Sequence, residues 1–264
     1  MTQLFNLVMS GYVIAFFFAV INLFVKRRFL DWAINSLLTA ASMLQLVYII
    51  WRWHEAGRPP FSNMFESLVL FAWATVVVYL VVRVKQHVPV LGVAAALLAT
   101  VTLAYASSFK SDIEPLVPAL RSNWLTFHVF TCFLGYSGFA ISFIAAIAYL
   151  IAAKRSSTLS EQPARNAMES VMTQTVAFGF IFLTIGIITG AVWANSAWGT
   201  YWSWDPKETW SLITWFIYAA FLHCRYMRGW SGRRAAWLSI VGFLSVLFTY
   251  IGVNFLLSGL HSYA

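Results

Sequence analysis

Residues 171–193 read VMTQTVAFGFIFLTIGIITGAVW, a stretch without a single charged side chain. A helix of about 20 apolar residues crosses a hydrocarbon core about 30 Å thick, so this stretch predicts a membrane-spanning helix. None of the long apolar stretches alternates with the period of two that is typical of a membrane β-barrel. The sequence therefore predicts an all-α, polytopic integral membrane protein, a bundle of about eight transmembrane helices at roughly 4–25, 32–51, 63–82, 88–106, 124–152, 171–193, 207–227 and 236–257.

The composition agrees with this class of protein. The chain of 264 residues is 61% hydrophobic and 10% charged, and its mean hydropathy is +0.75. A soluble domain of this length cannot hide so much apolar surface. The N-terminus lacks the basic region and the small-residue cleavage site of a signal peptide, so we expect the first stretch to be a helix. Nothing marks a separate soluble domain, and we expect one transmembrane domain over residues 1–264.

The basic residues predict the topology. The net charge is +8, and assigning the loops alternately to two sides places most Lys and Arg on one of them. By the positive-inside rule, both termini and the segment 194–210 then face outward, towards a periplasm, a lumen or the exterior. The charge is thus a topology signal, with anionic lipid as a further contact, and it requires no nucleic acid. The inner side holds Lys26, Arg27, Arg28, Arg83, Lys85, Lys154, Arg155, Arg165, Arg225, Arg228, Arg233 and Arg234; the outer side holds Arg52, Arg58, Lys110, Arg121 and Lys207.

The polar break after residue 193 is rich in tryptophan. Residues 198–210 read WGTYWSWDPKETW, and the whole external tryptophan-rich loop is expected over 194–210. One interpretation is an aromatic belt at the membrane interface. A belt is spread around the circumference, whereas these indoles are concentrated in one loop, which favours a broad, flat, apolar platform for a flat aromatic ligand. The tryptophans concerned are Trp193, Trp198, Trp202, Trp204, Trp210 and Trp215.

Acidic residues stand where two helices are expected to begin. Asp205 and Glu208 have the spacing of a capping box around Pro206, and Lys207 with the helix N-terminus suits an anionic group such as a carboxylate. Ser62 or Asn63 is expected to cap the helix that contains Glu66. Glu66 either pairs with Arg52 or Arg58, or contacts a ligand, a partner or a proton path.

The histidines divide by predicted depth. His128 and His261 lie on the outer side, one before and one after the tryptophan loop, and two neutral imidazoles across an aromatic surface suit axial ligation of a haem iron. Singly, each also fits a solvated histidine at the interface. His223 lies near the inner side within a predicted spanning helix, where an ionisable group is a functional candidate. Alternatively, His223 is favoured there by the dipole of the helix C-terminus.

These residues resemble the CcsA family, also called ResC, the membrane haem-handling subunit of the system II cytochrome c maturation machinery. The matching signature is the family's "WWD" loop, here residues 198–210, and the similarity continues through Leu222-His223 to His261. Residues 60–67 and 124–129 also look like family segments, so the similarity spans nearly the whole chain.

The resemblance implies the function and its ligands. It implies delivery of haem b to the outer face of a bacterial inner or plasma membrane or a thylakoid, where the vinyl groups react with the CxxCH thiols of an apocytochrome c. In the family two external histidines bind haem iron, and they correspond to His128 and His261; a histidine of an inner haem site corresponds to His223. The inner site takes its other ligand from a partner subunit, CcsB or ResB, so the chain is expected to be a subunit of a holocytochrome c synthase.

The expected chemistry is positioning, without a catalytic acid, base or nucleophile. A haem exporter or chaperone without ligation activity of its own is the alternative function. A b-type electron-transfer protein is a third, but it would need histidine pairs at matched depth, which His223 lacks. Besides the three histidines, the residues expected to contact haem are Trp198, Tyr201, Trp202, Trp204, Asp205, Lys207 and Trp210.

Overall fold

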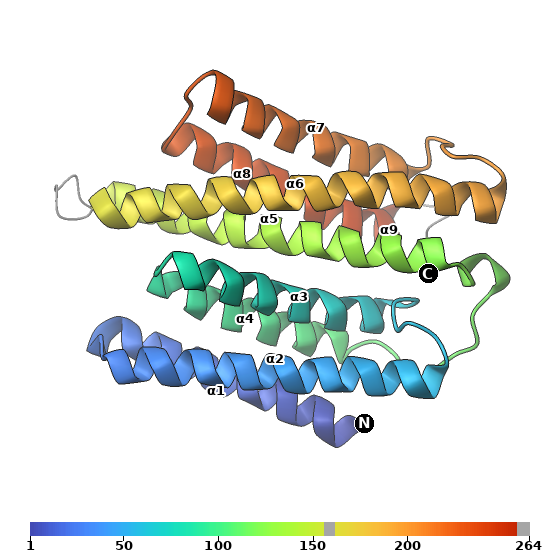
Figure 1. Ribbon diagram of the computed structural model, residues 1–264, viewed down its shortest axis with the longest axis horizontal. Helices are drawn as coiled ribbons and strands as arrows, with labels where there is room; N and C mark the ends of the chain where they lie inside the picture. Colours follow the sequence, from blue (N-terminus) through green and yellow to red (C-terminus); the bar gives the residue numbers. More distant parts are fainter. Residues whose placement is uncertain (156–161, 258–264) are drawn as a thin grey trace. The chain divides into compact units, whose positions relative to one another are not determined.

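The computed structural model describes residues 1–155 and 162–257, and these residues form helices and no β strand (Figure 1). The main helices are α1 (Thr2–Val25), α2 (Arg28–Ala56), α3 (Met64–Lys85), α4 (Pro89–Ala106), α5 (Asn123–Arg155), α6 (Gln162–Trp198), α7 (Pro206–Met227) and α8 (Arg233–Leu247). Shorter elements are the 3-10 helix η1 (Pro118–Leu120), the π-helical stretch η3 (Phe248–Gly252) and α9 (Val253–Leu256).

The helices confirm the predicted all-α, polytopic membrane protein. Seven of the described helices are long and apolar enough to span a membrane. α7 falls outside this group because it carries Lys207, Glu208, His223 and Arg225. Its 22 residues nevertheless cover about 33 Å at 1.5 Å per residue. It packs against α6 and α8, so α7 has the length and the neighbours of the eighth predicted span.

The chain forms two compact units. Unit 1 is Met1–Pro115 and unit 2 is Leu116–Ala264. In unit 1, α1 and α3 each pack against α2 and α4. In unit 2, α5 and α7 each pack against α8 and α6. The single domain expected over residues 1–264 stays a prediction.

The predicted boundaries around α6 are wrong at both ends. α5 continues to Arg155 and α6 begins at Gln162, so much of the stretch between the predicted spans 124–152 and 171–193 is helical. Ala, Arg, Glu and Met are good helix formers, and they extend the helix beyond its apolar part. At its other end α6 runs to Trp198, which leaves only residues 199–205 irregular. The 37 residues of α6 cover about 56 Å, well beyond a hydrocarbon core of about 30 Å.

Glycines allow α5 and α6 to pack closely along their length. A Cβ added to Gly135 would lie 3.0 Å from the carbonyl oxygen of Gly179, and one added to Gly138 would lie 2.8 Å from that of Thr175. Small residues at such an interface let two membrane helices approach until their backbones touch. The α5–α6 pair is therefore a tightly registered support for the side chains at its ends.

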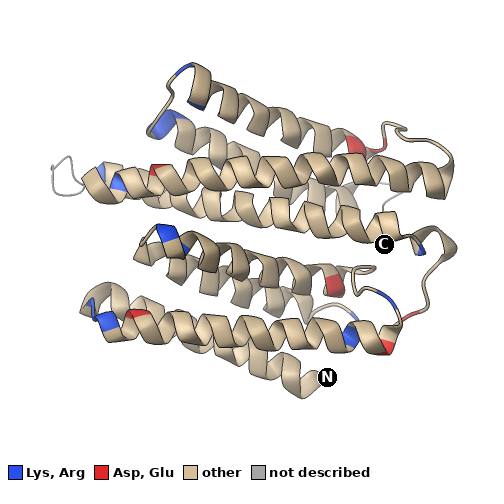
Figure 2. Cartoon of the chain, viewed as in Figure 1, with Lys and Arg blue, Asp and Glu red and all other residues tan. Residues whose placement is uncertain are grey.

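Charged residues lie mainly near the ends of the helices in each unit (Figure 2). In unit 1, Lys26, Arg28, Arg83 and Lys85 lie where α1 turns into α2 and α3 turns towards α4; we call this the basic end of unit 1. In unit 2, the turn from α7 into α8 carries a second group, Arg225, Arg228, Arg233 and Arg234.

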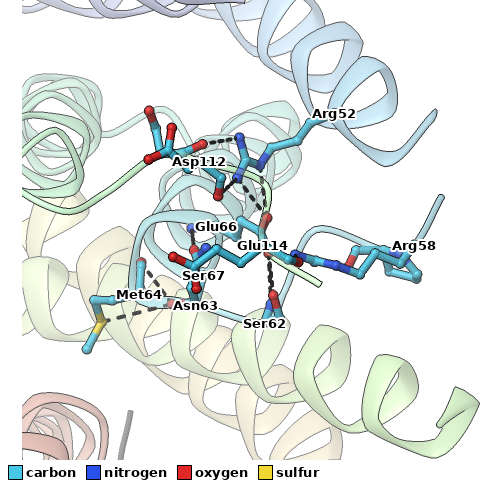
Figure 3. A network of polar contacts seen from close by, with 11 residues as sticks. Arg52, Arg58, Ser62, Asn63, Met64, Glu66, Ser67, Asp112 and Glu114 are labelled. Atoms are coloured by element: carbon cyan, nitrogen blue, oxygen red, sulfur yellow. Dashed lines mark hydrogen bonds and ion pairs between the residues drawn. The ribbon is translucent and has the colours of Figure 1, made fainter. Parts of the chain in front are cut away.

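A buried ion-pair network fixes the other end of unit 1 (Figure 3). Arg52 at the end of α2 and Arg58 in the following loop converge on Glu66, with N–O distances of 2.9 and 3.1 Å. The Glu66 side chain is fully enclosed. The predicted ion pair is confirmed, and Glu66 pairs with both arginines, whereas the sequence predicted a pair with one of them. Further N–H groups of the two guanidinium groups donate to backbone carbonyls of the 107–115 segment, namely those of Ser111, Asp112 and Glu114.

Glu66 also ties the start of α3 to the loop before it. Asn63 is the N-cap residue, and its side chain accepts the Glu66 N–H at 2.8 Å. The Glu66 carboxylate in turn accepts the N–H of Ser62 at 2.9 Å. The predicted cap is thus confirmed at Asn63, and Ser62 contributes through its bond to Glu66.

Candidate functional site

The tryptophan segment, residues 194–210, begins in the last turn of α6 and ends in the first turn of α7. Gly199 ends α6 with a φ of +80°, and its N–H donates to the Asn195 carbonyl at 3.0 Å. A left-handed helix end favours glycine because a Cβ is strained there. Asp205 then opens α7 and accepts the Lys207 N–H at 2.9 Å. Residues 199–205, the irregular part of the segment, therefore form a short bridge between α6 and α7 that is held at both helix ends.

Glu208 holds this bridge from the α7 side. Its Oε2 accepts the N–H of Ser203 at 2.8 Å and that of Asp205 at 3.2 Å, which confirms the predicted capping box. Trp204 lies between these two residues and adopts a φ of +60°. Such a left-handed conformation costs about 1–2 kcal/mol for a residue with a Cβ. The carboxylate thus fixes both neighbours of a strained tryptophan whose side chain is 68% exposed.

The tryptophans do not form the single flat platform that the sequence predicts. The rings of Trp193 and Trp198 meet at 62° with centroids 4.8 Å apart, and those of Trp202 and Trp204 meet at 90° and 5.8 Å. Edge-to-face contacts are favoured because the edge of one ring carries the opposite partial charge to the face of the other. The exposed aromatic surface of the segment comes mainly from Trp204 and from Tyr201, which is 60% exposed.

Three tryptophans of the cluster anchor the surrounding helices instead. Trp193 is buried and donates its indole N–H to the Ala119 carbonyl in η1 at 2.9 Å. Trp215 donates to Thr184 Oγ1 of α6 at 2.9 Å. Trp210 packs against Phe248 of the π-helical stretch, with ring centroids 4.2 Å apart. These contacts connect α6 to the short helix before α5, and they connect α7 to α6 and to the π-helical stretch.

His128 lies on α5, half-buried, in the part of unit 2 that also holds Trp193. Its Nδ1 is 2.7 Å from the Gly186 carbonyl oxygen on α6, and its ring stacks on Trp193 at 6.1 Å and 19°. A carbonyl oxygen only accepts, so Nδ1 carries the proton and the lone pair of the neutral ring lies on Nε2. A histidine that binds a metal usually donates its other ring N–H in this way. The His128 imidazole thus fits an iron ligand through Nε2.

Gly190 makes the space for this imidazole. A Cβ added to Gly190 would lie 2.5 Å from His128 Nδ1, a distance that real contacts do not allow. Gly186 and Gly190 are four residues apart on one face of α6, so one supplies the carbonyl acceptor and the other the room for the ring. The backbone of α6 therefore contributes directly to the orientation of His128.

Lys207 points into unit 2 from the start of α7. Its ammonium donates to Asn254 Oδ1 at 2.8 Å, and Asn254 donates to the Tyr250 carbonyl. Asn254 follows the π-helical stretch, whose wider turn changes the direction in which later side chains project. The contact with Asn254 therefore links the start of α7 to α9.

The remaining predicted ligands are placed differently. His223 is exposed on α7, on a face shared with Ile213, Phe216 and Ala220. His261 lies outside the described residues. Trp198 and Trp202 are half-buried and Asp205 is buried by its capping role. Among the described residues, His128 is thus the one predicted iron ligand that lies close to the tryptophan segment.

Sequence reasoning missed several residues of the site. Gly186, Gly190 and Asn254 contribute through a carbonyl, an absent Cβ and an amide, and none carries a charge or a ring that draws notice. The spacing Gly186-x-x-x-Gly190 within an apolar stretch was the available signal, because small residues four apart mark a close helix contact. The π-helical stretch had no comparable signal.

The sequence was compared with known proteins. It matches the sequence model of a family described as "Cytochrome C assembly protein" over residues 61–261. A "Cytochrome c biogenesis protein CcsA" from Synechococcus sp. (strain CC9605) is 38% identical over 272 residues, which covers 88% of this chain and 90% of that one. A protein of the same name from Guillardia theta is 40% identical over 237 residues and covers 80% and 79%.

Among solved structures, a "Cytochrome c Heme Lyase CcmF" has a similar fold. Its TM-score is 0.69 and its sequence identity is 18%. The match covers 94% of this chain and 46% of that protein, so this chain spans about half of its length. At this identity the likeness concerns the fold alone.

Proposed function

The chain belongs to the CcsA family of cytochrome c assembly proteins, and from this premise we propose that it presents haem b to an apocytochrome c. In the reaction each cysteine S–H of a CxxCH motif adds across a haem vinyl group. The sulfur bonds to one vinyl carbon and the hydrogen ends on the other, so no electrons are gained or lost. Such an addition depends on holding the vinyl carbons beside the thiols, which is catalysis by positioning.

The observation that carries the proposal is the contact between His128 Nδ1 and the Gly186 carbonyl oxygen. The Nδ1 atom is committed to that carbonyl at 2.7 Å, which leaves Nε2 as the atom that binds iron. Stacking on Trp193 holds the ring plane, and the missing Cβ of Gly190 leaves the space that the ring occupies. We propose His261 as the second external ligand.

The tryptophan segment is proposed to cover the bound haem. Trp204 and Tyr201 offer exposed aromatic surface, and the Glu208 bonds hold Trp204 outward. Lys207 supplies a cation for a propionate, and the buried cap Asp205 fixes the start of its helix. The remaining proposed contacts are the half-buried rings Trp198, Trp202 and Trp210.

His223 is proposed as the ligand of a separate, inner haem site. An exposed imidazole on an otherwise apolar helix face suits a site completed by a second chain. A CcsB/ResB-type membrane subunit is the proposed partner, and together the two chains would form a holocytochrome c synthase. Lys and Arg at the helix ends favour an orientation with the tryptophan segment and both termini on the periplasmic, external or lumenal side.

An absorption spectrum tests the external ligand directly. We would purify the chain in detergent, with and without the partner, as wild type and as His128→Ala, His261→Ala and His223→Ala. Low-spin haem that is lost or altered in both outer variants is the expected result. His54→Ala is the matched control, since His54 is an exposed histidine at the end of α2. Unchanged haem in His128→Ala, in protein that melts like wild type, would overturn the ligand assignment.

A second assay separates ligation from mere transport. The purified subunits would be mixed with reduced haem and a CxxCH peptide, and the peptide mass measured after denaturation. A gain of one haem is expected for a synthase. Haem binding without covalent product, in the presence of the partner, would favour the exporter or chaperone function.

A further inference from the structure

A cavity of about 870 Å³ lies at the basic end of unit 1, between α2 and the end of α3. It is unrelated to the residues proposed to handle haem, all of which belong to unit 2. Its size falls within the range of small-molecule sites, about 300–1,000 Å³. Its wall combines charged, aromatic and hydroxyl side chains, so we expect a ligand that has both charged and apolar groups.

The charges of the cavity favour an anion. Arg28 and Arg83 flank it from α2 and α3. Arg28 makes no ion pair or hydrogen bond to any residue that the structure describes, and Arg83 contacts the ring nitrogen of His87 at 2.8 Å. The one carboxylate, Asp31, is already engaged by Asn22 at 2.8 Å and by His87 at 3.6 Å. Two guanidinium groups therefore face the cavity with only one carboxylate, which has other partners.

The polarity of the wall changes in a regular order along α2. Arg28, Trp32 and Ser36 are exposed and recur every fourth residue, so they lie on one face of the helix. The same exposed face continues through Ala40 to Met43, which is 56% exposed. At 1.5 Å per residue, Ser36 is about 12 Å and Met43 about 22 Å from Arg28 along the helix. Along this face a cationic side chain is thus followed by an aromatic ring, then by a hydroxyl group and then by apolar side chains.

This order matches that of a phospholipid from head group to acyl chain. We infer that the cavity binds one anionic phospholipid of the adjacent leaflet. Arg28 and Arg83 hold the phosphate, the Ser36 hydroxyl meets the ester region, and an acyl chain lies along Met43. Basic pockets between membrane helices are known to hold anionic head groups. A free phosphate ion shares the head-group chemistry but leaves the apolar part of the face uncovered.

Native mass spectrometry of the full chain tests this inference. Delipidated protein would be titrated with phosphatidylglycerol, with phosphatidylcholine, and with inorganic phosphate as competitor. One phosphatidylglycerol per chain is the expected tight adduct, and Arg28→Gln with Arg83→Gln should weaken it at least about tenfold, the loss expected for one charge-assisted contact. Arg233→Gln with Arg234→Gln removes the same charge from unit 2 and should leave this affinity unchanged.

A third variant keeps the test decisive if the double variant misfolds. Ser36→Leu fills the cavity without changing charge, and it should also weaken the phosphatidylglycerol adduct while leaving thermal unfolding near that of wild type. Equal affinity for phosphatidylcholine, or equal losses in the unit 1 and unit 2 arginine variants, would overturn the inference. Displacement of the lipid by inorganic phosphate at similar concentration would assign the cavity to a free anion instead.

Discussion

The network around Glu66 in unit 1 and the tryptophan segment in unit 2 contain the same local hydrogen-bond pattern, but their surroundings differ. In each, a glutamate at the third position of a helix accepts the N–H of a serine in the loop before it: Glu66 from Ser62 and Glu208 from Ser203. Glu66 is then enclosed by Arg52 and Arg58. Glu208 forms no ion pair among the described residues, and the loop that it holds stays exposed.

The difference separates a structural polar centre from one that we propose to be functional. Around Glu66 every charge has a charged partner, and further guanidinium N–H groups donate to backbone carbonyls. Around Glu208 the same bonds hold Trp204 in a strained conformation with its ring exposed. Backbone strain that the surroundings maintain is a feature of binding sites. The variants below test this contrast.

Breaking the unit 1 network should have the largest effect on stability. Glu66→Gln leaves two buried guanidinium groups without their carboxylate, and removing one partner of a buried pair costs about 3 kcal/mol or more. We expect that loss in the free energy of unfolding, measured by denaturant titration in detergent. The haem spectrum of the folded fraction should not change.

Glu114→Gln is the matched control, because it removes an exposed carboxylate whose backbone carbonyl alone takes part in the network. Its stability should be close to that of wild type. A Glu66→Gln protein of normal stability with an altered haem spectrum would reverse the contrast and assign Glu66 a direct role in the site.

Gly190→Ala should affect both stability and haem binding. The new methyl group meets His128 Nδ1 at 2.5 Å, so the imidazole must leave the Gly186 carbonyl. Overpacking of this kind costs about 1–3 kcal/mol, and losing the partner of a metal-binding histidine weakens metal affinity about 10–100-fold. Haem titration followed in the Soret band measures the second effect.

Gly135→Ala separates the two effects, because it crowds the same α5–α6 interface without touching His128. It should lose stability while keeping the haem affinity of its folded fraction. Equal haem losses in both variants would show that helix packing in general, and not the His128 orientation, governs binding.

How much of this could be predicted depended on sequence separation. The capping box of Asp205 and Glu208 spans four residues, and the all-α fold follows from apolar length, so both were predictable. Glu66 and Arg52 are 14 residues apart, yet scarce charges in an apolar chain made the pairing predictable. The bond between His128 and Gly186 joins residues 58 apart, and it depends on the packing register of two helices. That register, like the π-helical stretch, follows from side-chain fit and not from composition.

Glu208→Gln should loosen the bridge by a smaller amount. The amide side chain keeps one acceptor but loses the charge that strengthens two bonds, and loss of such a cap costs about 0.5–2 kcal/mol. Hydrogen exchange at the Ser203 and Asp205 amides should become faster. Glu55→Gln, at an exposed glutamate of α2, should leave that exchange unchanged. Unaltered exchange in Glu208→Gln would mean that the conformation of the bridge does not depend on the Glu208 carboxylate.

Trp204→Gly should give the smallest change in stability. Glycine adopts a φ of +60° without the penalty of about 1–2 kcal/mol, and its greater freedom in the unfolded chain returns roughly half of that. The edge-to-face contact with Trp202 is lost as well, and its contribution of about 0.5–1.5 kcal/mol offsets this gain. We therefore expect the free energy of unfolding to stay close to that of wild type while haem affinity falls, because the exposed indole is lost. Tyr201→Gly is the control, since it removes a similarly exposed ring without relieving a positive φ, and it should lose stability. If Trp204→Gly is the less stable of the two, the conformation of Trp204 is not strained. A normal haem affinity in Trp204→Gly would instead mean that the strain does not serve to present the ring.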